Sequence, residues 1–188
     1  MSYELVVIGA SWGGLHAIER LLQALPTGFT TPIAIAQHRA VDSGSGALSR
    51  MLSVRSGLEV QEAGDKQPVE AGRVYIAPPD YHLLVDQDGF ALSVDEPVQY
   101  SRPSIDVLFD SAADVYGERL IGVVLTGANP DGAYGLARVK RRGGATIVQD
   151  PDTAERPEMP AAAVATGAAD HVLPLEAIAP KLVELAAA

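Results

Sequence analysis

The sequence contains no cysteine among its 188 residues. Without thiols, neither disulfides nor thiolate metal sites can stabilise the fold. The sequence also lacks a run of about 18 apolar residues, which a membrane-spanning helix requires. It begins Met-Ser-Tyr-Glu-Leu, without the basic segment and apolar stretch that open a signal peptide. We therefore expect a cytoplasmic protein that is not inserted into a membrane.

Positive charge is scarce, because 14 Lys and Arg face 24 Asp and Glu and give a net charge of −10. A nucleic-acid surface needs basic side chains to neutralise phosphates. The main basic cluster, residues 140–142, instead stands where a helix should end and its dipole favours cations. We do not expect nucleic acid as a partner. Apolar residues make up 47% of the sequence, and the length fits one folded domain over residues 1–188.

Buried strands alternate with amphipathic helices along the chain. Residues 5–8 form a β-branched run typical of a strand buried on both faces, and apolar residues then recur at helical spacing from Leu15 to Leu25. Further expected elements are strands at residues 32–36, 74–77, 120–125, 145–148 and 171–173, a hairpin of residues 82–85 and 90–94, and helices opened by Pro103, over residues 132–142, in the Ala-rich tail and from Leu175. This order predicts an α/β fold: an open, mostly parallel doubly wound sheet with helices on both faces and an antiparallel hairpin.

Three side chains suited to nucleophilic catalysis follow three of the predicted strands: Ser11, His38 and Asp131. In an open parallel sheet, ligands bind at the carboxyl ends of the strands. A serine becomes nucleophilic when an imidazole takes its proton, and a carboxylate orients that imidazole. The sequence therefore predicts a serine hydrolase with these three residues as its catalytic triad.

The turn around Ser11 has the G-x-S-x-G pattern, which exposes a serine hydroxyl between a strand and a helix. In such a turn the amide of Trp12 would point toward a developing oxyanion. Structural alternatives remain open, since Ser11 and Asp131 could each cap the helix that follows. His38 could be a hydrogen-bonded histidine at a strand end, and His82 could line the cleft.

A dinucleotide-binding site is the competing interpretation, because a Gly-rich turn after a first strand also binds phosphate. Two features oppose it. The G-x-G-x-x-G fingerprint needs glycine where Ser11 stands, and Gln37 and His38 occupy the place of the acidic residue that binds ribose.

Several separated motifs together resemble the catalytic domain of the CheB-type protein-glutamate methylesterases of bacterial chemotaxis. The resemblance extends from about residue 4 to residue 175. The motifs that carry it are residues 8–14 (IGASWGG), 37–38 (QH), 75–78 (YIAP), 102–109 (RPSIDVLF), 125–133 (LTGANPDGA) and 159–160 (MP).

The resemblance implies hydrolysis of glutamate methyl esters on chemoreceptors or receptor-like signalling proteins, with release of methanol and, in some members, deamidation of glutamine. Ser11 would be the nucleophile, His38 the general base and then acid, and Asp131 its partner. The oxyanion donors would be the backbone amides of Trp12 and Ala128. No cofactor or metal is implied.

Some features depart from the family pattern. Trp12 stands where threonine is usual, Arg39 adds a charge beside His38, and Pro130 removes an N–H just before Asp131. The last change motivates an alternative function, a catalytically weakened module that binds receptors or signalling partners. Family members also typically carry an N-terminal receiver domain, whereas the first strand here begins at Leu5, so we expect constitutive or partner-controlled activity.

Overall fold

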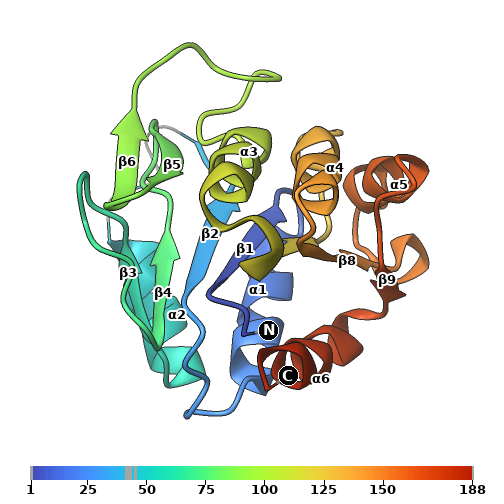
Figure 1. Cartoon of the computed structure of the whole chain (residues 1–188), viewed down its shortest axis with the longest axis horizontal. Coiled ribbons are helices and arrows are strands. Elements are labelled where there is room, and N and C mark those ends of the chain that lie inside the picture. Colours follow the sequence, from blue (N-terminus) through green and yellow to red (C-terminus); the bar gives the residue numbers. More distant parts are fainter. Residues whose placement is uncertain (1, 41–43, 45, 188) are drawn as a thin grey trace.

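The computed structural model describes residues 2–40, 44 and 46–187, and a seven-stranded sheet forms its centre (Figure 1). Every neighbouring pair of strands in this sheet is parallel. In spatial order the strands are β3 (Glu59–Glu62), β4 (Arg73–Ile76), β2 (Ile33–Gln37), β1 (Leu5–Ala10), β7 (Leu120–Val124), β8 (Ala145–Gln149) and β9 (His171–Leu173).

Helices cover both faces of the sheet (Figure 1). On one face lie α1 (Gly14–Ala24), α2 (Ala47–Ser56) and α6 (Leu175–Ala186); on the other lie α3 (Ile105–Tyr116), α4 (Ala133–Arg141) and α5 (Glu158–Ala165). Short 3₁₀ turns occupy Gly117–Arg119 and Pro151–Thr153. Because side chains alternate along a strand, Val6 and Ile8 of β1 pack in the first layer, whereas Leu5 and Val7 pack in the second. None of the described helices combines the length and apolarity needed to cross a membrane.

A separate antiparallel pair, β5 (His82–Asp86) and β6 (Gly89–Ser93), packs beside α3. Its buried side chains, among them Leu83 and Phe90, belong to the same hydrophobic cluster as α3. The Asp86 carboxylate closes the turn by accepting hydrogen bonds from the amides of Asp88 and Gly89, at 2.8 and 3.0 Å. The predicted fold class, including this hairpin, is confirmed.

Two elements were not predicted from the sequence, namely α2 and β3. In β3 only Val60 is buried, so a short polar edge strand gives no continuous apolar run. In α2 the buried residues are Ser49 and Leu52, and Val54 is exposed, so the helical stripe that normally identifies a surface helix is weak.

The strand order reverses direction at β1, since the chain moves to β2 on one side and later to β7 on the other. Gly9 pairs with both Ala36 and Val124, so the carboxyl ends of these three strands lie at one edge of the sheet. Crevices at such switch points are where open α/β sheets bind ligands. Ser11, His38 and Asp131 all follow these strands.

Candidate active site

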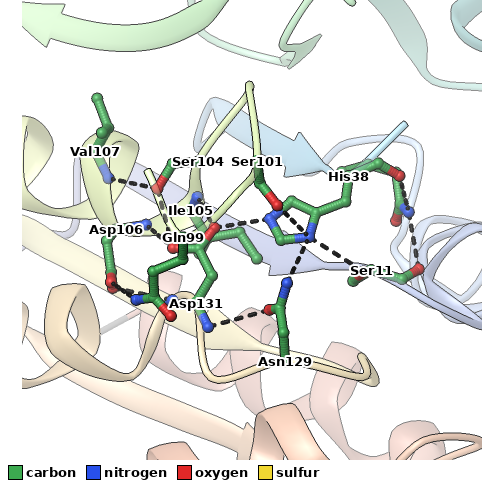
Figure 2. A network of polar contacts seen from close by, with 12 residues as sticks. Ser11, His38, Gln99, Ser101, Ser104, Ile105, Asp106, Val107, Asn129 and Asp131 are labelled. Carbon is green, nitrogen blue, oxygen red and sulfur yellow. Dashed lines mark hydrogen bonds and ion pairs between the residues drawn. The ribbon is translucent and has the colours of Figure 1, made fainter. Parts of the chain in front are cut away.

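Ser11 occupies a tight turn between β1 and α1. Its amide donates to the carbonyl of Thr126 at 3.0 Å, and its carbonyl accepts from the Gly14 amide at 2.8 Å. The residue that caps α1 is Gly13, in a left-handed conformation with φ 75°, and no side chain completes this cap. The interpretation of Ser11 as a helix cap is therefore wrong, and its hydroxyl points toward His38 instead (Figure 2).

His38 lies between the serine and the aspartate (Figure 2). Its Nδ1 is 3.1 Å from the Ser11 Oγ, and its Nε2 is 2.7 Å from the Asp131 Oδ2. A carboxylate accepts, so Nε2 carries the proton and Nδ1 presents a lone pair to the serine hydroxyl. The histidine side chain is only 11% exposed. This geometry suits proton transfer from the serine through the imidazole.

Asp131 is completely buried and accepts hydrogen bonds from several donors. Besides His38, these are the Ser104 hydroxyl at 2.9 Å and the amides of Ile105 and Asp106 at 2.7 and 2.9 Å. Burial opposes ionisation, but the hydrogen bonds from His38 and from the two amides outweigh it and hold the pKa of Asp131 below its ordinary value. An ionised Asp131 can stabilise a protonated imidazole.

The carboxylate of Asp131 does not cap the helix that follows it. The capping residue of α4 is Gly132, with φ 97° and no side-chain cap. Asp131 instead meets the first amides of α3. The interpretation of Asp131 as the cap of α4 is therefore wrong.

Two further polar side chains approach the imidazole. The Ser101 Oγ and the Asn129 Nδ2 each lie 3.4 Å from the His38 Nδ1 (Figure 2). Asn129 also accepts from the Asp131 amide at 3.1 Å through its Oδ1. Sequence reasoning did not assign these contacts, although Asn129 lies two residues before Asp131 and a short-range Asx turn could have indicated its role.

Of the two amides expected to bind an oxyanion, that of Trp12 lies in the serine turn and that of Ala128 lies in the loop after β7. Within the described residues, neither the Trp12 nor the Ala128 amide donates a hydrogen bond to another group of the chain. The loop that carries Ala128 closely approaches the nucleophile, since a Cβ on Gly127 would come 2.9 Å from the Cβ of Ser11. The two amides are therefore available as donors beside Ser11.

The residues that depart from the family pattern have local partners. The Arg156 guanidinium lies over the Trp12 ring, 5.4 Å from its centroid, and the Trp12 side chain is 60% exposed. Arg39 forms an ion pair with Glu62 at 3.2 Å, which compensates its charge. Pro130 contributes its carbonyl, which accepts from the Ala133 amide at 3.1 Å.

His82 lies under the site rather than in it. It is 2% exposed, its Nδ1 accepts from the Ser104 amide, and its Nε2 lies 3.1 Å from the Glu96 carbonyl. Both ring nitrogens are engaged with backbone, so His82 supports the segment that leads into α3.

Comparisons with known proteins agree with the motifs. The family model described as CheB methylesterase matches residues 6–182. A putative protein-glutamate methylesterase/protein-glutamine glutaminase of Leptospira interrogans is 48% identical over 98% of this chain and 96% of its own length. A protein-glutamate methylesterase/protein-glutamine glutaminase of Anaeromyxobacter dehalogenans is 46% identical over 97% of this chain, which spans 53% of that protein.

The fold also matches a solved structure over nearly the whole chain. The crystal structure of the Thermotoga maritima CheB methylesterase catalytic domain gives a TM-score of 0.91 at 37% identity, covering 98% of this chain and 100% of that one. Motifs, family model and structural match all extend over nearly the whole chain. The chain belongs to the CheB methylesterase family.

Proposed function

We propose that this protein hydrolyses methyl esters of glutamate side chains in a chemoreceptor or a receptor-like signalling protein and releases methanol. The observation that carries the proposal is the hydrogen-bonded series Ser11, His38 and Asp131 in a member of the CheB methylesterase family. The relatives named above are described as acting on protein glutamate and protein glutamine.

In the first half of the reaction, the Ser11 Oγ attacks the ester carbonyl while the His38 Nδ1 takes the hydroxyl proton. The carbonyl oxygen becomes an oxyanion, for which the amides of Trp12 and Ala128 are the donors. Collapse of this intermediate breaks the bond to the methoxy group, which leaves as methanol with the proton from His38. A glutamyl ester of Ser11 remains.

In the second half, water attacks this acyl-enzyme while His38 takes one of its protons. Collapse returns this proton to the Ser11 Oγ and frees the glutamic acid side chain, which loses its remaining proton to solvent and becomes a carboxylate. With a glutamine side chain the same steps would release ammonia instead of methanol. Asp131 remains ionised throughout and stabilises the imidazolium in both halves.

The test compares methanol release from methylated chemoreceptor membranes by the wild type and by Ser11→Ala. We expect the variant to lose essentially all turnover and to keep its folding stability within about 1 kcal/mol, because the Ser11 hydroxyl caps no helix. Ser56→Ala, at the far end of α2, is the matched control and should remain active.

Binding of methylated receptor without methanol release by a folded wild type would contradict the proposal. It would favour the receptor-binding module, and the loop containing Asn129 and Pro130 would be the first segment to change. Release that persists in Ser11→Ala would show that another residue is the nucleophile.

A further inference from the structure

A second buried carboxylate lies beside the proposed triad, and the reaction above gives it no role. Asp106, in the first turn of α3, is 7% exposed. Its Oδ1 accepts from the amides of Gly132 and Gly135 at 2.9 and 2.7 Å, and its Oδ2 accepts from the Gln99 side chain at 3.0 Å. It thus joins three segments around the site (Figure 2).

Asp106 and Asp131 exchange amide partners at the starts of two helices. Asp131 lies just before Gly132, the capping residue of α4, yet its carboxylate accepts from amides at the start of α3. Asp106 belongs to α3, yet its carboxylate accepts from amides at the start of α4. The first amides of a helix have no partner within the helix, so each aspartate satisfies donors that the other segment leaves open.

We propose that Asp106 is a positioning residue of the catalytic triad, which holds Asp131 in hydrogen-bonding reach of His38 by fixing the start of α4. The amide that Asp106 binds belongs to Gly132, the residue after Asp131. On the other side, Asn129 binds the Asp131 amide. The backbone of Asp131 is therefore held on both sides, and its carboxylate is fixed by α3.

Close packing of the two helices makes this exchange possible. A Cβ on Gly135 would come 2.6 Å from the Cβ of Phe109, and a Cβ on Gly132 would come 2.7 Å from the Cγ2 of Ile105. Such distances are too short for a side chain, so only glycine lets α4 approach α3 this closely. Without the approach, the Asp106 carboxylate could not reach both amides.

The third contact of Asp106 is with Gln99, which lies in the same turn as Ser101. Gln99 belongs to a tight turn in which Val98 and Ser101 pair, and both central residues, Gln99 and Tyr100, have positive φ, 48° and 63°. Such conformations are unfavourable for residues other than glycine and need fixed contacts around them. Through Gln99, Asp106 also fixes the turn that brings Ser101 to 3.4 Å from His38.

The burial of this carboxylate is energetically unfavourable. Burial and the nearby charge of Asp131 raise the pKa of Asp106 to about 6, against the hydrogen bonds from Gly135, Gly132 and Gln99. A residue that served only to fill space between α3 and α4 would not need buried acceptor oxygens bound to three donors. The buried Asp106 carboxylate, which lowers folding stability, lies where three segments of the site meet.

The test compares Asp106→Ala with Asp106→Asn, since asparagine keeps an oxygen for the two α4 amides and alanine does not. The Gln99 side-chain amide, which donates to Asp106, can turn its oxygen toward the NH2 group of asparagine. We expect Asp106→Ala to lower kcat for methanol release about ten- to a hundred-fold with little change in KM, because misplaced catalytic groups lose rate rather than binding. Asp106→Asn should stay within about three-fold of the wild type. Asp86→Ala is the control, since it also removes two amide contacts, but in the hairpin turn.

A second readout is the rate at which a fluorophosphonate labels Ser11. It should fall in Asp106→Ala in parallel with kcat. This proposal rests on the proposed function only for its substrate. A wild type that is labelled at Ser11 but releases no methanol would refute the ester substrate. The labelling rates would then still test the role of Asp106.

If Asp106→Ala does not fold, which circular dichroism would reveal, Asp106→Ser replaces it, because its side chain is too short to bridge the two amides. Unchanged kcat and labelling in the folded Ala or Ser variant would overturn the proposal. Equal losses in Asp106→Asn and Asp106→Ala would also overturn it, since the negative charge and not the contact with α4 would then be decisive.

Discussion

At the scale of single residues, Asp131 combines two functions in one carboxylate. It orients His38, and it accepts from the Ser104 hydroxyl and the first amides of α3. An asparagine has one acceptor oxygen and one donor group in the same space. Because Asp131 faces four donors, replacing it with asparagine would place the NH2 group of asparagine against buried hydrogen-bond donors.

We expect Asp131→Asn to lower kcat by about 10²- to 10⁴-fold, because the imidazole loses the partner that selects its tautomer. Some activity should remain, since the nucleophile and the base are retained. Contact between the asparagine NH2 group and the buried donors should also lower the free energy of unfolding by about 1 to 3 kcal/mol. Steady-state kinetics and urea unfolding measure the two effects. Asp88→Asn, with the same charge change at an exposed position in the hairpin turn, controls for charge. Full activity in Asp131→Asn would require another carboxylate as the partner of His38.

At the scale of secondary structure, the site depends on how α3 and α4 meet the ends of β1 and β7. Neither helix carries a nucleophile or a base, but their first turns supply the donors and acceptors that hold Asp131. The glycines at the contact set the distance between the helices. A change in this distance should therefore affect catalysis as well as stability.

We expect Gly135→Ala to lower the free energy of unfolding by about 1 to 3 kcal/mol, because its Cβ would overlap Phe109. The better helix propensity of alanine offsets this by only about 1 kcal/mol. Since the start of α4 must move, kcat should fall more than KM rises. Gly28→Ala is the control, because no atom lies within 4 Å of its added Cβ. Stability and kcat unchanged in Gly135→Ala would show that the helices can separate without consequence.

These contacts also explain what could be predicted from the sequence and what could not. Ser11, His38 and Asp131 each follow a buried apolar strand, so hydrophobic pattern and parallel topology suffice to bring them to one edge of the sheet. The roles of Ser104 and Asp106 depend on which helix packs against which, and no local pattern specifies that contact. Proximity in the sequence offers Asp131 as a possible cap of the helix that follows it, whereas in the structure the carboxylates of Asp131 and Asp106 accept from amides 25 or more positions away.

At the scale of the whole molecule, the paired aspartates give opposite contributions to the pH dependence of folding. The pKa of Asp131 is below its ordinary value, so its stabilising contribution is present above about pH 4 and is lost as the pH falls further. The pKa of Asp106 is raised from 3.8 to about 6, so between these values the folded state binds more protons than the unfolded state. Through Asp106, the free energy of unfolding therefore decreases as the pH rises from about 4 to about 6.

Asp106→Asn removes this second contribution and leaves the other 23 acidic residues of the chain in place. We expect the variant to be more stable than the wild type by about 1 to 3 kcal/mol at pH 7.5, and by less than about 1 kcal/mol at pH 4, because the wild-type Asp106 is then protonated in the folded state. Urea unfolding of both proteins at the two pH values measures the difference. A stability difference that is the same at both pH values would mean that Asp106 titrates near its ordinary pKa. A variant that is more stable at neutral pH and still active would show that the negative charge of Asp106 lowers folding stability, and that one oxygen at this position is enough to hold the contacts around Asp131.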